Sequence, residues 1–178
     1  VSLLAEQVDG ELRSRIEALE IVANMLSLSG PIKPTDVQRL LESRKLLQYL
    51  FNAGVFVTAT DGTVIADTPR RSNRLGLNLN ERDYMVTALK EGKSSIGKPV
   101  IDKSLKTPVI SIAAPVRNTQ GQAIGVLVGV MHLSQFNFLD KLTNNPYGIS
   151  GGYLIADQLS RLTITATAAN TCIRVQTV

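Results

Sequence analysis

The chain of 178 residues contains one cysteine, Cys172, one histidine, His132, and no tryptophan. A lone cysteine excludes a disulfide within the chain, and so small a stock of Cys and His argues against a zinc site or any other metal centre. Aromatic residues make up only 4% of the sequence, which argues against a stacking platform for bases. The basic residues form no dense cluster, so we expect no nucleic-acid partner.

The sequence also lacks a hydrophobic run long enough to cross a membrane. The longest one, residues 123–131, reads AIGVLVGVM, whereas a membrane-spanning helix needs about 20 apolar residues. Its β-branched and glycine residues are typical of a buried strand. The chain begins with Val1 rather than Met, so we expect it to be a segment of a longer protein.

Apolar residues recur at steps of three and four through the first 28 residues, as in a long helix. Such a helix would extend roughly 40 Å, more than a small domain needs. Residues 1–34 are therefore predicted to be a signalling helix that pairs with a second copy in a homodimer. The stripe that contains Leu12, Ile16 and Leu19 would form the interface.

Residues 35–133 are predicted to form one α+β domain. A second helix ends near Gly54 and has one apolar face, formed by Val37, Leu40, Leu41, Leu47 and Leu50. Asp61-Gly62 is a strong signal for a β-hairpin turn. A short helix over residues 80–93 is followed by expected strands near 95–101, 108–116 and 123–133. This order predicts an antiparallel five-stranded sheet flanked by helices.

Residues 134–178 are predicted to be a connector and the start of a second, truncated module. A short helix is expected over residues 134–142. The stretch 151–167, GGYLIADQLSRLTITAT, then repeats the pattern of the first hairpin as two strands around a turn. The last eleven residues show no clear pattern, and we expect them to be poorly anchored.

This order of elements resembles the Cache family of extracytoplasmic sensor domains, in particular the double-Cache type. The similarity is carried by VFVTATDGTVIAD, ERDYMVTALKEGK, GKPVIDKSLKTPVISIAAPV and GQAIGVLVGVMHLSQF, together with the long first helix. The resemblance implies a PAS-like sheet that holds a small ligand, in the periplasmic or extracellular part of an inner-membrane receptor. The start of the second module is most similar to those that precede GGDEF diguanylate cyclase domains.

The first turn of the helix over residues 80–93 is the candidate binding site. Arg82 lies about one turn before Met85 on nearly the same side, so its guanidinium is expected over the sheet, beside the phenol of Tyr84. A guanidinium grips a carboxylate or phosphate with two parallel hydrogen bonds. The alternative is structural: Arg82 pairs with Asp83, Glu81 or a loop carbonyl, and Tyr84 is part of the core edge.

Three further residues are candidates for the same site. Ser111 alternates with Ala113 in a predicted central strand and faces the pocket, solvent or the core. Asp102 and Lys103 lie at a strand end, where pocket rims form. Residues 69–106 carry nine basic and four acidic residues, an excess of +5. That excess favours an anionic small molecule as the ligand.

The resemblance also limits the ligand. In the Cache subgroup that binds amino acids, this helix starts with Arg-x-aromatic-aromatic; Arg82 and Tyr84 match, but Met85 stands in place of the second aromatic. The subgroup also holds the ammonium group with an aspartate in the last distal strand, where this chain has Val130. A small organic acid without an amine therefore fits better than an α-amino acid.

No phosphate-binding glycine loop, nucleophile elbow or metal-ligand cluster occurs in the sequence, so no enzyme activity and no cofactor are expected. The favoured interpretation is the sensor domain of a membrane-tethered receptor of the diguanylate cyclase type, with a histidine kinase or chemoreceptor as alternatives. A rival from another class is an interaction module without a small ligand. An intracellular PAS domain with haem or flavin is disfavoured by the single His132 and the few aromatics.

Overall fold

The computed structural model describes seven stretches of the chain: residues 2–28, 33–102, 107–133, 135, 152–157, 162–167 and 174–177. Its chain contacts divide it into two compact units. The first comprises residues 1–13, 98–110 and 132–178, and the second comprises residues 14–97 and 111–131. The helix expected over residues 134–142 lies outside the described residues.

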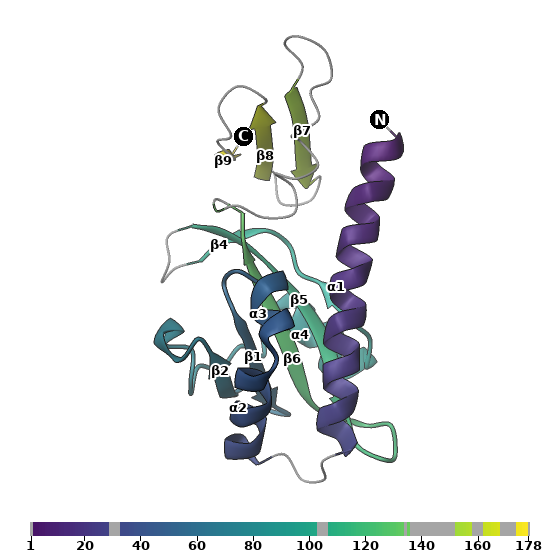
Figure 1. Cartoon of the computed structure of the whole chain (residues 1–178), viewed down its shortest axis with the longest axis vertical. Helices are drawn as coiled ribbons and strands as arrows, with labels where there is room; N and C mark the ends of the chain where they lie inside the picture. Colours follow the sequence, from purple (N-terminus) through teal and green to yellow (C-terminus); the bar gives the residue numbers. More distant parts are fainter. Residues whose placement is uncertain are drawn as a thin grey trace. The chain divides into compact units, whose positions relative to one another are not determined.

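The long first helix is present as α1, Ser2–Leu28 (Figure 1). Its C-terminal half buries Leu19, Val22, Ala23 and Leu26 within the second unit, and the backbone N–H of Arg117 donates to the Ser27 hydroxyl at 3.1 Å. Leu19 is fully buried in its own chain, so the apolar stripe predicted to face a partner is in part a core face. Nowhere in the described part of the chain does a helix combine the length and hydropathy needed to cross a bilayer.

The predicted second helix is two helices. Proline occupies the first turn of α2, Pro34–Ser43, where its missing N–H is not needed. The backbone of Arg44, at φ −92° and ψ 71°, then leaves helical geometry, and α3 follows as Lys45–Leu50. Val37, Leu41 and Leu47 are buried as the periodicity predicts.

The Asp61-Gly62 turn joins β1, Val55–Ala59, to β2, Val64–Thr68, as an antiparallel hairpin. Asp61 accepts the backbone N–H of Thr63 at 2.8 Å, and this hydrogen bond is the main reason why the pKa of its carboxyl is lowered. Gly62 adopts φ +83°, a conformation that disfavours a side chain. Asp61 is therefore a turn residue, as expected.

The short helix begins at Asp83 and not at Asn80. Arg82 is its N-cap, α4 covers Asp83–Val86, and a wider π-type turn over Thr87–Glu91 (η2) continues it. Gly92 ends the segment in the left-handed conformation at φ 62°, as the glycine predicts. Met85 and Ala88 are fully buried.

The main sheet has the order β2-β1-β6-β5-β3, with β4 also paired to β5. Its long central strands are β5, Pro108–Arg117, and β6, Ala123–His132. The strand expected near residues 95–101 is two short strands, β3, Ser95–Ile96, and β4, Val100–Ile101, because Pro99 between them has no N–H for the ladder. The α+β class and the antiparallel sheet are confirmed, with six strands in place of five.

In the core of the second unit, the backbone of β6 lies close against a buried aromatic ring. Strand β1 pairs with β6, and Phe51, just before β1, is fully buried. A Cβ on Gly129 of β6 would lie 2.4 Å from the Phe51 ring, so this position admits only glycine without a shift of the ring. Phe51, Phe56 and Met85 are among the largest fully buried side chains.

In the first unit, Val100 of β4 pairs with Val109 of β5, and the His132 ring nitrogen Nδ1 lies 3.0 Å from the Thr107 hydroxyl. The two strands expected near the C-terminus are present as β7, Gly152–Asp157, and β8, Leu162–Thr167. A third strand, β9, Arg174–Thr177, pairs antiparallel with β8. The expectation that the last residues are poorly anchored is therefore wrong for Arg174–Thr177.

Candidate functional site

The first turn of α4 brings two of the predicted site residues together. The Ser111 side chain lies close enough to the Tyr84 phenol to lower its pKa, although 27 positions separate the two residues in the sequence. Gly97 makes this approach possible, because a Cβ there would lie 2.6 Å from Cδ1 of Tyr84 and 3.4 Å from the carbonyl oxygen of Ser111. Ser111, whose direction the sequence left open, is buried in β5 with its side chain toward Tyr84.

Burial raises the pKa of the Tyr84 phenol above its usual value, and the Ser111 side chain and the charge of Arg82 lower it in part. A raised phenol pKa keeps the neutral, protonated form at neutral pH. Tyr84 therefore retains an O–H that is able to donate a hydrogen bond to an anionic oxygen.

Arg82 lies at the entrance of this helix and is exposed. Its backbone carbonyl accepts the N–H groups of Met85 and Val86 at 3.0 Å each, so the residue is fixed as N-cap while its side chain reaches solvent. Its charge still acts on the Tyr84 phenol. No ion pair between Arg82 and Asp83 or Glu81 is recorded in the described part of the chain, where the structural alternative would place one.

The sequence did not single out Arg74, whose charge also acts on Tyr84. Its Nη2 lies 2.8 Å from Oδ1 of Asp67, and its guanidinium stacks over the Phe56 ring at 5.1 Å from the centroid. Asp67 is fully buried and also accepts the Ser72 hydroxyl. The available signal was the basic segment over residues 69–106, which includes Arg74 but does not show which of its cations turns inward.

Of the remaining two candidates, the structure describes Asp102 and not Lys103. Asp102, half-buried after β4, belongs to the first unit, where its backbone N–H donates to the Thr107 carbonyl at 2.9 Å. Lys103 lies outside the described residues. Within the second unit, the candidate site therefore comprises Arg82, Tyr84 and Ser111, with Arg74 close enough to influence Tyr84 electrostatically.

In the folded chain, carboxylates from other segments neutralise part of the positive charge carried by positions 69–106. Arg70 pairs with Glu42 at 2.8 Å and Arg74 pairs with Asp67, and both carboxylates lie outside that segment. Lys90, Lys93 and Lys98 are exposed, as expected of a solvated rim. Arg82 is thus the cation of this segment that lies at the Tyr84 site with no ion pair recorded to a described residue.

The fold is that of Cache-type ligand-binding domains of bacterial receptors. The ligand-binding domain of the Pseudomonas fluorescens chemoreceptor CtaA, in complex with L-serine, superposes with a TM-score of 0.70 at 23% identity over 87% of this chain and 64% of that chain. The Pseudomonas aeruginosa chemoreceptor PctB, in complex with L-glutamine, gives 0.72 at 21% identity over 98% and 68%. An extracellular ligand binding receptor from Desulfohalobium retbaense gives 0.73 at 14% identity over 92% and 29%.

The CtaA and PctB structures are ligand-binding domains of chemoreceptors. The chain spans 64% of the CtaA domain, so it corresponds to part of such a domain. No protein-family model and no curated protein matches the sequence. At these low identities the similarity establishes the fold, and the ligand has to be inferred from the residues of this chain.

Proposed function

We propose that this chain is the extracytoplasmic sensor portion of a membrane-tethered bacterial receptor, and that it binds a small anionic metabolite through Arg82, Tyr84 and Ser111. The observation that carries the proposal is the approach of the Ser111 side chain to the Tyr84 phenol at the Arg82 end of α4. It places a protonated phenol, a hydroxyl and an exposed guanidinium at one end of a helix. The fold, which the chain shares with receptor domains that bind small ligands, supports the same function.

The ligand is a small organic acid that lacks an amine. The guanidinium of Arg82 and the hydroxyl of Tyr84 both donate to a carboxylate. Val130 of β6, buried and apolar, stands where the amino-acid-binding Cache subgroup resembled by this sequence has an aspartate. The CtaA and PctB complexes contain L-serine and L-glutamine, so this chain would differ from them in ligand class.

The output domain of the full receptor is proposed to be a diguanylate cyclase, as the start of the C-terminal module suggests. A chemoreceptor fits equally well, since CtaA and PctB are chemoreceptors, and a histidine kinase is the third alternative. The coding sequence on both sides of this segment decides between them. Two flanking membrane spans are expected, and their absence would contradict the extracytoplasmic location.

Small carboxylates are expected to raise the melting temperature of the protein, and Arg82→Ala to abolish the rise. At a ligand concentration about 100-fold above Kd the stabilisation is about 2.7 kcal/mol, or about 5–10 °C for a chain of this size. The measurement is a thermal-shift screen of mono- and dicarboxylates followed by calorimetric titration. Because Arg82 is exposed, its replacement should leave the melting temperature of the free protein nearly unchanged.

Lys93→Ala is the matched control for this screen, because it removes an exposed cation of the same segment without touching α4. It should retain the full shift. A screen in which no carboxylate or other anion moves the melting temperature would contradict the sensor proposal. That result would favour the rival, a module that binds another protein and no small ligand.

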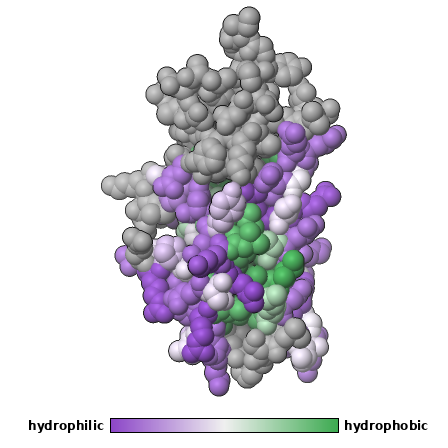
Figure 2. Space-filling model, viewed as in Figure 1, coloured by the Kyte–Doolittle hydropathy of each residue, from purple (hydrophilic) through white to green (hydrophobic). Residues whose placement is uncertain are grey.

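A homodimer through α1 is also proposed, with its contact surface shifted from the predicted stripe. Ile21 is 58% exposed and Met25 36% exposed on this helix, and Figure 2 shows apolar surface gathered over its C-terminal half and over α3. The exposed Ile21 is able to contact a second copy, whereas the buried Leu19 is not. Helix pairing would give a ligand signal a route along α1 toward the membrane.

Ile21→Glu is expected to weaken this dimer by at least about tenfold, because it places a charge in an apolar contact. Sedimentation equilibrium across a dilution series measures the change. Leu46→Glu is the matched control: Leu46 is 65% exposed on α3, and its replacement should leave the dimer intact if the two copies meet along α1. A dimer lost in Leu46→Glu and kept in Ile21→Glu would place the interface on α3.

A further inference from the structure

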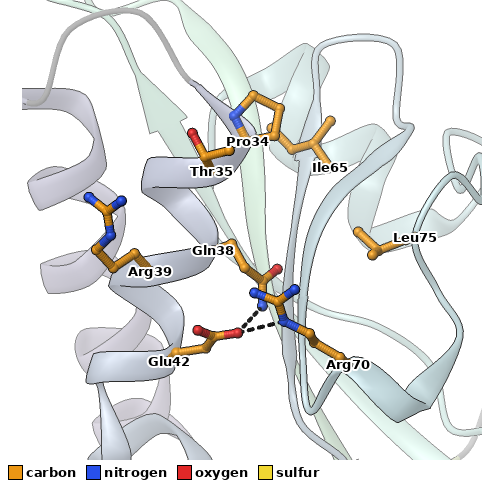
Figure 3. Close-up of a pocket in the computed structure, with 8 residues that line it drawn as sticks. All are labelled: Pro34, Thr35, Gln38, Arg39, Glu42, Ile65, Arg70 and Leu75. Carbon is orange, nitrogen blue, oxygen red and sulfur yellow. Dashed lines mark hydrogen bonds and ion pairs between the residues drawn. The ribbon is translucent and has the colours of Figure 1, made fainter.

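A hollow lies in another part of the second unit. It opens between α2 and the segment formed by β2 and the following basic loop, with a volume of about 410 Å³ (Figure 3). That volume falls in the range of about 300–1,000 Å³ typical of small-molecule sites. Its lining shares no residue with Arg82, Tyr84 or Ser111, so it is a separate site.

One wall of the hollow is a chain of polar contacts. The buried Gln38 of α2 donates to Oε1 of Glu42 at 2.9 Å, and Nε of Arg70 donates to the same oxygen at 2.8 Å. Gln38 is in turn fixed to β2 by two hydrogen bonds of 2.9 Å with the backbone of Asp67. Glu42 and Gln38 thereby anchor the guanidinium of Arg70 by its Nε edge.

The other edge of that guanidinium remains available. In the described part of the chain, the two terminal nitrogens of Arg70 have no recorded partner, and Figure 3 shows the group reaching from the loop toward α2. Two parallel N–H groups on one edge match the two oxygens of a carboxylate. Arg70 is therefore held in place for an anion while it still pairs with Glu42.

The opposite side of the hollow is apolar. Ile65 of β2 is half-buried, Leu75 is 51% exposed, and Pro34 begins α2 at the rim. A hydrocarbon chain laid along these residues would remove apolar surface from water at both partners. An anion with no apolar part, such as phosphate, would leave this wall uncovered.

The charges select against a cationic head group. Glu42, the carboxylate of the lining, is already engaged by Arg70 and Gln38, and these two hydrogen bonds lower the pKa of its carboxyl. Arg39 adds a second cation at the rim, where its pair with Asp36 is long, at 3.7 Å. With two guanidinium groups against one carboxylate in the lining, the hollow favours a single negative charge.

We propose that this hollow is a second ligand site, for a small monocarboxylate with a hydrocarbon tail. The carboxylate binds the two terminal nitrogens of Arg70, and the tail packs against Ile65 and Leu75. The site lies at α2 and β2, the two elements that the hydrogen bonds of Gln38 connect. Its ligand is amphipathic, in contrast to the small acid proposed for the Tyr84 site.

Octanoate is the probe for the test. Titrated into the isotopically labelled chain, it should produce saturable NMR shifts of the backbone amides of residues 35–42, 65 and 70–75. Shorter acids should bind more weakly, by up to roughly fourfold for each buried methylene removed, and octylamine should not bind there. Arg70→Gln should weaken octanoate binding by about tenfold to a hundredfold, the range expected for a charge-assisted hydrogen bond.

Arg44→Gln is the matched control, because Arg44 is exposed at the end of α2 and does not line the hollow. It should bind octanoate as the parent chain does. Leu75→Ser should weaken octanoate more than butyrate, since only the longer tail reaches that side chain. Shifts that fail to saturate, equal binding of octylamine, or unchanged affinity in Arg70→Gln would each overturn the proposal, and none of these outcomes bears on Arg82.

Discussion

Arg74→Met is expected to destabilise the protein by about 3–5 kcal/mol, the usual cost of removing one partner of a buried ion pair. The side chain of Asp67 has no exposed surface and that of Arg74 is 15% exposed. Arg74 also donates to the Ala53 carbonyl at 3.1 Å, so its loss removes the cation that pairs with Asp67 and the donor of a half-buried carbonyl. Methionine keeps a side chain of similar length but removes the cation–π contact with the Phe56 ring, so the measured loss includes that contact.

Urea denaturation followed by circular dichroism measures this loss. Arg39→Met serves as control, because Arg39 is exposed and its pair with Asp36 at 3.7 Å contributes little. The double variant Asp67→Asn, Arg74→Met should recover part of the loss, since no uncompensated charge then remains buried. A single variant as stable as the parent would show that Asp67 is satisfied without Arg74.

Gln38→Leu is expected to lower the free energy of unfolding by about 2–5 kcal/mol. It leaves two buried backbone groups without a hydrogen-bond partner, at a cost of about 1–3 kcal/mol each. Strand β2 is the edge of the main sheet, and the outward N–H and C=O of Asp67 would have no partner without the Gln38 amide. The amide supplies one acceptor and one donor at 2.9 Å each, as a neighbouring strand would. Leucine fills similar volume but supplies neither.

Thermal and urea unfolding of the variant, compared with Gln48→Leu, provide the measurement. Gln48 is exposed and makes only a 3.5 Å contact with the Glu42 carbonyl, so its replacement should change the stability little. Gln38→Glu keeps the acceptor for the Asp67 N–H and loses the donor, which predicts an intermediate effect. If Gln38→Leu were as stable as Gln48→Leu, water would have to satisfy the edge of β2.

Much of the fold was predictable because its signals are local. The Asp61-Gly62 turn, the helix start near Arg82 and the glycine stop at Gly92 each depend on a few neighbouring residues, and the structure has all three. The buried apolar face of α2 and α3 follows from periodicity in the same way. The structure differs from the sequence-based expectation at two local breaks. One is at Arg44, between α2 and α3, and the other is at Pro99, between β3 and β4.

The partners of the polar side chains were not predictable. Arg74 reaches Asp67 seven residues away, while Arg70 reaches Glu42 and Gln38 reaches Asp67 across 28 and 29 residues. Such pairings depend on how the loop after β2 folds back against α2, which no periodicity encodes. For this reason the sequence predicts a continuous positive charge over residues 69–106, although carboxylates from elsewhere in the chain neutralise two of its cations.

The sequence by itself determined the α+β class, the antiparallel hairpins and the adjacency of Arg82 and Tyr84 at one helix start, because these follow from backbone preferences and spacing within a few residues. The tertiary structure alone decided that Ser111 meets Tyr84, that Leu19 turns into the core, and that Arg70 is held beside a hollow. These outcomes depend on which surfaces the chain buries together. Burial is a property of the packed whole, and a linear pattern only restricts it.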